Sequence, residues 1–449
     1  MARYVKKTIH LKKALLMSKR SLVWFRRDLR LHDHPALAQA GHDGRVLALF
    51  TVSPEMRKLE ASCWWLEESL RELKSTLHDK GITLLVTDVD PTTCIPKLVE
   101  DYSCDQVLWN DSYATDERKV ELAVKKSLDT KSISYQALDG DLLFPHHELT
   151  KENGDPYSIF TPFYKRSQQE TVKRPIAMPE EWQGIRTEAL LTIEELELLP
   201  DHPWTKKFAS HWSPGEKAGI AKFQQFAKSD IEAYKKMRDF PDAQATSEIS
   251  PYLTWGNLSV RAVYYAAKRE KNAEPYLRQL VWREFAKRQL MQHPTLETKA
   301  LRSEFEKFSW RDSQADFEKW KRGETGYPLV DAGMKQLWET GWMHNRVRMV
   351  AASFLTKHLL LPWQWGAEWF KETLVDYDEA NNGMGWQWVA GTGIDAAPYF
   401  RIFNPTTQLE KFDKHEEYVH HWKANQDLEP IVDHKEARER ALKANKAIK

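Results

Sequence analysis

The sequence predicts an α/β domain with a doubly wound parallel sheet, a long linker and a larger all-helical domain. Short apolar runs alternate with amphipathic stretches from residue 21 to about 143, which is the pattern of repeated strand–helix–strand units. Many prolines and few periodic runs follow, and helical periodicity dominates from Ala218 onward. We therefore expect an extension at 1–20, an α/β domain at 21–145, a linker at 146–217 and a helical domain at 218–449.

Five strands are expected in the α/β domain. They lie at residues 22–25, 46–52, 82–88, 106–109 and 132–138. The stretch 61–81 between two of them has helical character and ends in Gly81, a residue suited to a helix C-cap. The domain contains no GxGxxG and no Walker loop, so we do not expect it to hold a dinucleotide or nucleoside triphosphate by a phosphate loop.

Composition narrows the classes of protein. The 66 Lys and Arg nearly balance the 65 Asp and Glu, so a nucleic-acid surface would have to be a local basic patch. Three cysteines without a CxxC pair and the lack of a long apolar run favour a cytoplasmic protein outside any membrane, and we expect a monomer. The 16 histidines show no HExxH spacing, so no metal is predicted. The basic, acid-free residues 1–16 are expected to be an extension, with Met17 as the start.

Two helical segments combine aromatic and polar side chains on one face. In the segment 276–291, Gln279, Trp282 and Arg283 lie opposite an aliphatic stripe. In the segment 341–361, Trp342, Asn345, Arg346 and Met349 share one face, whereas Val347, Val350 and Phe354 share another. Packing alone explains a Trp or Met, but not the Asn and Arg beside them. These faces therefore predict the walls of a polar-rimmed aromatic pocket.

Two long motifs lie about 350 residues apart. One is SLVWFRRDLRLHDHPAL at 21–37, and the other is DYDEANNGMGWQWVAGTGIDAAPYFRIFNP at 376–405. Together with WREF, TGYPLVDAGM and GWMHNRVRM, they resemble the DNA photolyase/cryptochrome family over residues 21 to about 422. The match is most similar to class I cyclobutane pyrimidine dimer photolyases.

That resemblance implies FAD held in a U-shaped conformation within the helical domain. The expected cofactor-binding residues are Tyr234, Thr246, Ser247, Glu248, Ile249, Ser250, Tyr276, Arg283, Trp342, Asn345, Arg348, Asp376, Tyr377, Asp378 and Asn382. Thr246 to Ser250 would bind the phosphates, and Arg348 with Asp376 would form an ion pair beside the isoalloxazine. Asn382 would face flavin N5 as a neutral amide. On its own, Asn381-Asn382-Gly383 is typical of a plain turn.

The resemblance also implies an electron relay and a substrate site. Trp386, Trp363 and Trp310 match the family's path from flavin to surface, although most of the 19 tryptophans serve packing. Trp282, Trp388 and Met349 would surround a flipped-out pyrimidine dimer, a mode of recognition for which photolyases are a standard example. The residues expected to bind damaged DNA are Arg238, Gln279, Trp282, Asn345, Arg346, Trp388 and Arg401.

One substrate residue departs from the family pattern. Gln279 stands three residues before the WREF tryptophan, where a glutamate usually hydrogen-bonds the dimer. An amide still donates a hydrogen bond but carries no charge, so we expect reduced but surviving repair.

An antenna chromophore is the second expected cofactor. The stretch WNDSYATDERK resembles a methenyltetrahydrofolate-binding loop, with Asp116, Glu117 and Lys299 as the expected antenna-binding residues. Acidic residues at a helix start explain Asp116 and Glu117 equally well. A deazaflavin and a site without an antenna remain alternatives.

The sequence thus predicts an FAD-dependent enzyme that splits cyclobutane pyrimidine dimers in UV-damaged DNA under light, without sequence preference. The main alternative is a cryptochrome photoreceptor that uses the same flavin without repair. A (6-4) photolyase lacks its usual histidines here, and a dark flavin oxidoreductase lacks a nicotinamide site.

Overall fold

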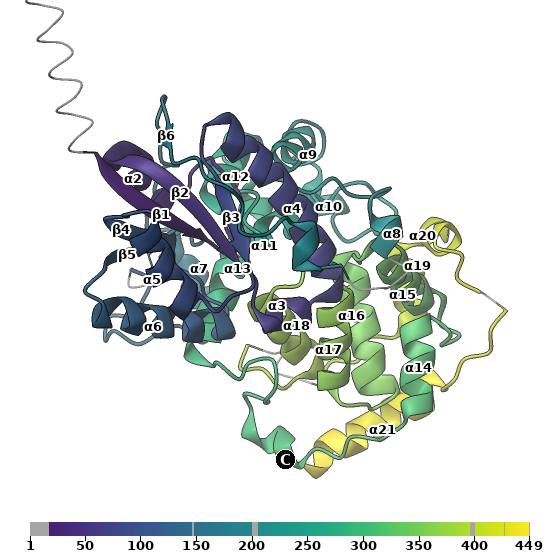
Figure 1. Cartoon of the computed structure of the whole chain (residues 1–449). Helices are drawn as coiled ribbons and strands as arrows, with labels where there is room; N and C mark the ends of the chain where they lie inside the picture. The colour runs from purple at the N-terminus through teal and green to yellow at the C-terminus, as the bar shows by residue number, and fades with distance from the viewer. Residues whose placement is uncertain (1–17, 146–147, 200–204, 396–399, 426, 449) are drawn as a thin grey trace, which may run out of the picture.

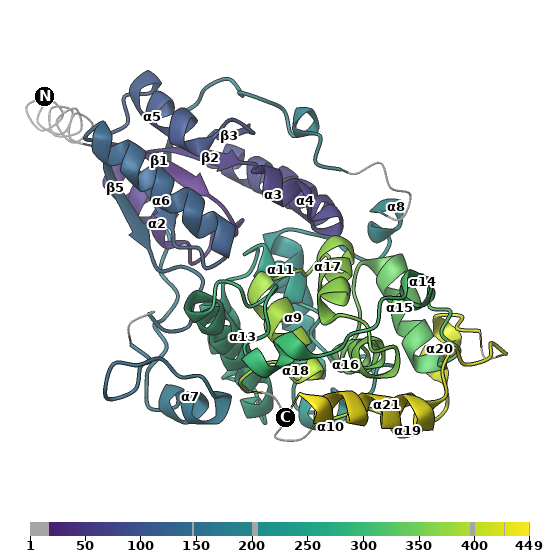
Figure 2. The same cartoon turned by 90° about the horizontal axis from the view of Figure 1, so that it is seen from below.

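The computed structural model describes residues 18–145, 148–199, 205–395, 400–425 and 427–448. It forms an α/β unit followed by a helical unit, joined by a segment that runs over the surface (Figures 1 and 2). Most of the extension expected at 1–20, including Met17, lies outside the described residues.

The first unit is built on a parallel sheet in the order β3-β2-β1-β4-β5. All five expected strands are present, as β1 (Lys19–Phe25), β2 (Gly44–Thr51), β3 (Leu84–Thr87), β4 (Gln106–Asn110) and β5 (Ser134–Leu138). Each pairs in parallel with its neighbours, for example Val23 with Ala48 and with Leu108. A sixth strand, β6 (Gln183–Gly184), comes from the linker and pairs with β2; its two residues gave no periodic signal.

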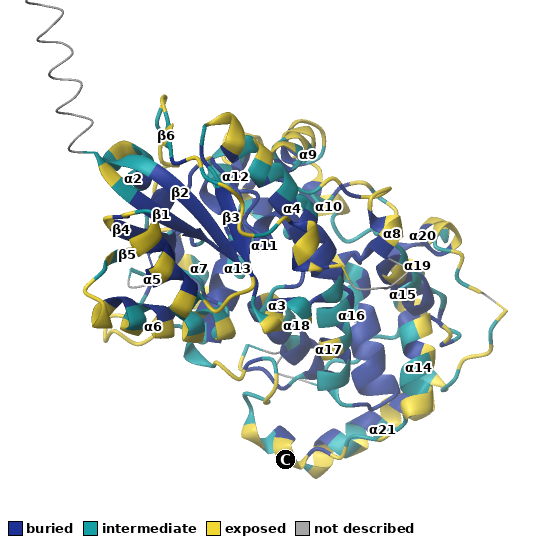
Figure 3. Ribbon diagram, in the orientation of Figure 1, coloured by how far each residue is buried: buried dark blue, intermediate teal, exposed yellow. Residues whose placement is uncertain are grey.

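Alternating residues of each strand pack against helices on opposite faces of the sheet. Val23 and Phe25 belong to the core beneath α2 (Pro35–Asp43) and α4 (Glu60–Asp79), whereas Leu22 and Trp24 belong to the core beneath α5 (Pro91–Asp101) and α6 (Thr115–Thr130). Burial on both faces explains why the strands are almost continuously apolar. The inner strands β1 and β2 are buried from their third residue onward (Figure 3). The expected doubly wound sheet is confirmed.

The linker is not wholly irregular. Its short helices are α7 (Phe160–Ser167), η1 (Glu194–Leu196) and α8 (Thr205–Phe208). The short helix α3 (Pro54–Arg57) belongs to the α/β unit and follows β2. Phe160 and Phe163 of α7 are buried against α13 (Glu274–Gln292), so this segment contributes to the core of the helical unit.

The helical unit contains no strand among its described residues. Its helices before α13 are α9 (Glu216–Ser229), α10 (Tyr234–Met237), α11 (Ser250–Thr254) and α12 (Val260–Ala267). After α13 come η2 (Ser303–Lys307), α14 (Gln314–Arg322), α15 (Pro328–Thr340), α16 (Asn345–Ser353), the π-helical turn η3 (Phe354–His358), α17 (Trp363–Thr373), α18 (Glu379–Ala390), α19 (Pro405–Phe412), α20 (Glu417–His421) and α21 (His434–Ala447). None of the described helices is long and apolar enough to cross a membrane.

The two units pack directly against each other. Leu29 N donates to Trp255 O at 3.1 Å, and the buried carboxylate of Asp33 pairs with Arg261 at 2.7 Å. Gly256 has a φ of +66°, and a Cβ there would overlap the backbone of Arg27. The α/β unit is thus fixed against the helical unit close to α11 and α13.

Candidate functional site

The centre of the helical unit is organised around α18, which packs against α13, α16 and α17. Asp378 caps α18 by accepting from Asn381 N at 2.9 Å, and Gly391 ends the helix with a φ of +83°. The helix therefore begins immediately after Asp376 and Tyr377 and carries Asn382, Trp386 and Trp388 on three successive turns.

A buried carboxylate, Asp376, gathers the first group of expected residues. Arg348 Nη2 pairs with it at 2.9 Å, and Ser250 Oγ donates to it at 2.6 Å. Trp342 Nε1 in turn donates to Ser250 Oγ at 3.2 Å. The carboxylate side chain is only 3% exposed, so its charge is stabilised by this pairing. The structure thus joins the expected ion pair to the segment 246–250.

The segment 246–250 leads into α11, which begins at Ser250. It contacts Tyr276, whose ring packs against that of Tyr234. Tyr276 Oη donates to Ser247 Oγ at 3.2 Å, and the rings of Tyr276 and Tyr234 meet edge to face at 5.3 Å. Glu248 has a φ of +49° and pairs with Lys222 at 2.7 Å. Thr246 and Ile249 complete this loop, and Ile249 is buried.

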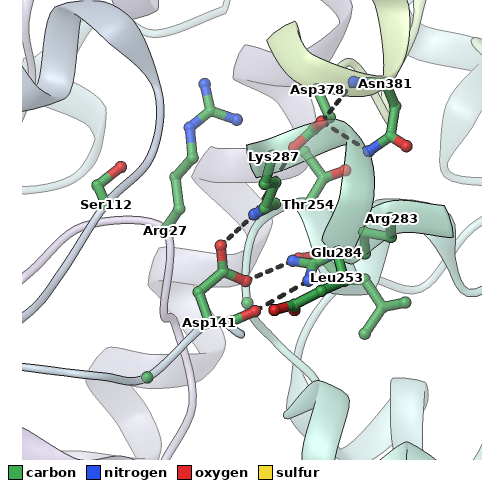
Figure 4. Close-up of polar contacts among 12 residues, drawn as sticks. Arg27, Ser112, Asp141, Leu253, Thr254, Arg283, Glu284, Lys287, Asp378 and Asn381 are labelled. Carbon is green, nitrogen blue, oxygen red and sulfur yellow. Dashed lines mark hydrogen bonds and ion pairs between the residues drawn. The ribbon is translucent and has the colours of Figure 1, made fainter. Parts of the chain in front are cut away.

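An ion-pair cluster links α13 to the α/β unit (Figure 4). Asp141 contacts both Arg283 and Lys287, and Arg283 Nη1 also donates to the Asp141 carbonyl at 2.9 Å. Lys287 lies 3.8 Å from Asp378. Burial opposes ionisation of Asp378, but Lys287, Arg283 and the bonds from Asn381 outweigh it and hold the pKa of Asp378 below its usual range. Asp141 was not predicted, because nothing in its local sequence reveals partners on α13.

The amide of Asn382 is held by the protein on one side. Its Nδ2 donates to Glu297 Oε1 at 2.7 Å and to the Ala367 carbonyl at 3.1 Å. Neither bond uses Oδ1, which therefore stays available as an acceptor. The Asn-Asn-Gly sequence, which on its own is typical of a turn, lies in the first part of α18.

The three tryptophans that the sequence predicts as an electron relay occupy one part of the core. Trp386 and Trp363 are 2% and 1% exposed, whereas Trp310 is half-buried at the edge of the same cluster. Gly366 of α17 faces Trp386 so closely that a Cβ would overlap the indole. Trp320 also contacts Trp386, with ring centroids 6.4 Å apart. Of the three, Trp310 is the most exposed.

The aromatic residues expected to hold the substrate contact neighbouring side chains, and Trp282 also meets Phe285 edge to face at 5.9 Å. Phe160 of α7 stacks on Trp282, with centroids 3.4 Å apart and planes within 9°. The Arg401 guanidinium lies 5.3 Å from the Trp388 ring centroid. The linker sequence around 158–166 stood out, but its role as a support for Trp282 was not predicted.

The polar residues that the sequence predicts to bind the substrate have partners within the protein. Gln279 Nε2 donates to the Pro275 carbonyl at 3.2 Å, and Asn345 Nδ2 lies 3.8 Å from Met349 Sδ. Asp239 pairs with Arg346 at 2.9 Å and lies 3.9 Å from Arg238. Binding of a DNA phosphate by these arginines would therefore compete with Asp239.

A cavity of about 660 Å³ lies between the two units, at the carboxyl ends of the strands. Glu117 lines it and binds Arg27 at 2.7 Å and Ser112 at 2.5 Å. Asp116 lines it too, but pairs with Lys119 at 3.0 Å. Lys299 is exposed and does not line this cavity, so the three expected antenna residues do not form one cluster.

Comparison with known proteins assigns this architecture to a family. The family model "DNA photolyase" matches residues 21–180, and "FAD binding domain of DNA photolyase" matches residues 276–427. The deoxyribodipyrimidine photo-lyase of Agrobacterium fabrum is 38% identical over 95% of this chain and 98% of its own length.

The chain belongs to the DNA photolyase/cryptochrome family.

Within the DNA photolyase/cryptochrome family, both branches resemble this chain. Cryptochrome-2 of Arabidopsis thaliana is 34% identical, covering 90% of this chain and 70% of its own length. The crystal structure of a class III photolyase from Agrobacterium tumefaciens superposes with a TM-score of 0.91 at 37% identity, covering 96% of this chain and 98% of its own. The class I placement suggested by the sequence motifs is therefore not supported.

Proposed function

We propose that this protein repairs cyclobutane pyrimidine dimers in DNA with light, using FAD. Bound reduced FAD, when excited by light, would donate one electron to the dimer, and the electron would return to the flavin after the cyclobutane ring splits. The protein's part is to hold the cofactor and dimer together, exclude water and balance charge. This proposal is supported by the photolyase relatives and by the arrangement around α18.

The described residues fit a flavin. Two phenols and the hydroxyls of the loop 246–250 offer donors next to a short helix, and Arg348 with Lys287 supplies positive charge beside buried carboxylates. The free Oδ1 of Asn382 suits the hydrogen-bearing N5 of a reduced flavin, because an amide accepts that bond without giving up a proton.

The observation that carries the repair assignment is the pair Trp282 and Trp388. They come from α13 and α18, two helices that pack together, and Phe160 supports one face of Trp282. An indole supported on one face has its other face available to stack against a flipped base. A dimerised pair of pyrimidines stacks poorly in the duplex, which lowers the cost of extrusion.

Several assigned roles belong to this proposal. Asn382, Gln279, Trp282, Trp388 and Met349 would act at the dimer or flavin. Electron supply would run through Trp386, Trp363 and Trp310, and Arg238, Arg346 and Arg401 would bind phosphates in a salt-dependent manner.

We also propose that the cavity between the units holds an antenna, with methenyltetrahydrofolate as the expected ligand. Its 660 Å³ matches the size of small-molecule sites, and Arg27 neutralises Glu117 at its wall. Release of chromophores by acid, followed by chromatography, would identify a folate, a deazaflavin or neither.

The decisive experiment uses a dimer-containing oligonucleotide and the purified, reduced protein. Thymines restored under blue light but not in the dark support photolyase activity. Bound flavin with no repair would instead favour a cryptochrome. Gln279 is the feature that favours a cryptochrome, because it lacks the charge of the usual glutamate and its amide donates to the Pro275 carbonyl. A Gln279→Glu variant should repair more efficiently than the wild type.

A further inference from the structure

Glu297, a residue with no role assigned from the motifs, lies against the Asn382 amide. It follows the end of α13, and its carboxyl group bridges two segments of the proposed flavin site. Oε1 accepts from Asn382 Nδ2 at 2.7 Å, and Oε2 accepts from Tyr377 Oη at 2.7 Å. Both oxygens are thus engaged by residues that flank Asp378.

This contact determines which atom Asn382 presents. The second amide hydrogen donates to the Ala367 carbonyl at 3.1 Å, so both N–H groups face acceptors of the protein. A rotated amide would direct Oδ1 at the Ala367 carbonyl and, whenever Glu297 is ionised, at a carboxylate as well, leaving acceptors opposed without a proton between them. The observed orientation leaves Oδ1 for the flavin side.

The backbone around Glu297 is fitted to α18. A Cβ on Gly383 would lie 3.2 Å from the Glu297 Cα and N, closer than most side chains tolerate. Beside it, Leu296 packs with Ala286, Leu290 and Ala380. The glycine after Asn382 therefore permits the approach that brings the carboxyl to the amide.

The carboxyl also reaches the cavity between the units. Glu297 lines that cavity together with Lys371, Tyr377 and Glu379, so water there can exchange its proton. Burial is the main cause that raises the pKa of Glu297 to about 7; Glu379 adds to the rise, and the bonds from Asn382 and Tyr377 and the charge of Lys371 offset part of it. The group therefore titrates in the neutral range rather than in the acid range usual for glutamate.

We propose that Glu297 is a positioning residue that fixes the Asn382 amide with its oxygen towards the flavin, and that the proton on its carboxyl sets the local charge there. The inference rests on the proposed flavin role of Asn382. When Glu297 is neutral, an anionic reduced cofactor is not repelled by a negative charge at this position. An ionised Glu297 holds the amide more firmly but places a negative charge behind it.

The test uses two substitutions and a matched control. Glu297→Gln keeps an acceptor oxygen and the volume but cannot ionise, whereas Glu297→Leu removes the acceptor. Glu379→Gln is the control, because Glu379 lines the same cavity and bonds Thr115 N at 2.8 Å rather than Asn382. The first readout is the midpoint potential of bound FAD against pH.

We expect the wild type to show a break in this profile near pH 7 and Glu379→Gln to keep a break at a lower pH, because the charge of Glu379 raises the pKa of Glu297; both Glu297 variants should lack the break. Glu297→Leu should bind FAD about tenfold more weakly, whereas Glu297→Gln should stay within about twofold. A break that persists in Glu297→Gln would overturn the inference.

A second readout needs no cofactor. Infrared spectra of flavin-free protein labelled with ¹³C-glutamate should show a protonated carboxyl band that disappears near pH 7 in the wild type and is missing in Glu297→Gln. A band unaffected by that substitution contradicts the inference. Failure of the wild type to bind FAD would overturn the proposed function instead, so the two failures are distinguishable.

Discussion

Asp141→Asn should destabilise the protein through the cluster that joins the units. Asp141 neutralises Arg283 and Lys287, whose side chains are only 11% and 9% exposed. Removing one partner of a buried ion pair costs about 3–5 kcal/mol, because the remaining charge is unpaired. Asp141 is itself 22% exposed, so water screens part of the effect and we expect a value near the lower end, about 3 kcal/mol.

The pH dependence gives this prediction a second test. Burial opposes ionisation of Asp141, but Arg283 and Lys287 outweigh it and hold its pKa below the usual 3.8. A lowered carboxyl pKa contributes stability that is fully present above the unfolded-state pKa and lost as pH falls through the folded-state pKa. The difference between Asp141→Asn and the wild type should therefore be full at pH 7 and shrink below about pH 4.

Urea unfolding measured across this pH range is the assay, with Asp101→Asn as the control. Asp101 is exposed at the end of α5, and its substitution should change the free energy of unfolding by no more than about 0.5 kcal/mol. A loss for Asp141→Asn as small as that of the control, or one that persists unchanged into acid, would refute the reasoning.

Three further predictions concern the core of the helical unit. Arg348→Met leaves a buried carboxylate unpaired and should lower the flavin-to-protein absorbance ratio of purified protein at least tenfold; full flavin content would contradict the proposed site. Gly366→Ala should displace Trp386, lower the free energy of unfolding by about 1–3 kcal/mol and slow light-driven flavin reduction. Gly385→Ala is the control, because a Cβ there meets no neighbouring atom and should change neither quantity. Equal photoreduction rates in the two variants would exclude a role of Trp386 in flavin reduction. Burial lowers the pKa of His358 to about 3, so this side chain is neutral in the folded protein at neutral pH. The free energy of unfolding should therefore fall as the pH drops from 6.5 towards 3. If the melting temperature of His358→Gln showed the same acid dependence as the wild type, the contribution of His358 would be refuted.

Local pattern predicted the sheet because most of its strands contain a short, almost continuous apolar run. The five long strands were found within a few residues, but β6 has only two residues and depends on pairing with β2. The helix 61–81 was likewise recognised from its period and its final glycine, and the structure places α4 at Glu60–Asp79.

Site residues were predicted from the sequence only where they lie within one of the motifs of the family. Arg348 and Asp376 meet as expected because both lie in long motifs of the family. No role was assigned to Asp141, Phe160 or Glu297. Each contacts a residue more than 80 positions away in the sequence: Asp141 contacts Arg283, Phe160 contacts Trp282, and Glu297 contacts Asn382. Such contacts follow from packing of the units, which has no local signal.

The central claim is that one site lets excited reduced FAD pass an electron directly to a bound pyrimidine dimer. The most direct measurement is the fluorescence of the reduced, flavin-loaded protein titrated with dimer-containing and undamaged oligonucleotides of the same sequence. We predict that dimer-containing DNA quenches the emission and is repaired under the same light, whereas undamaged DNA does neither. Tight binding of damaged DNA with unquenched emission and intact dimers would contradict the claim.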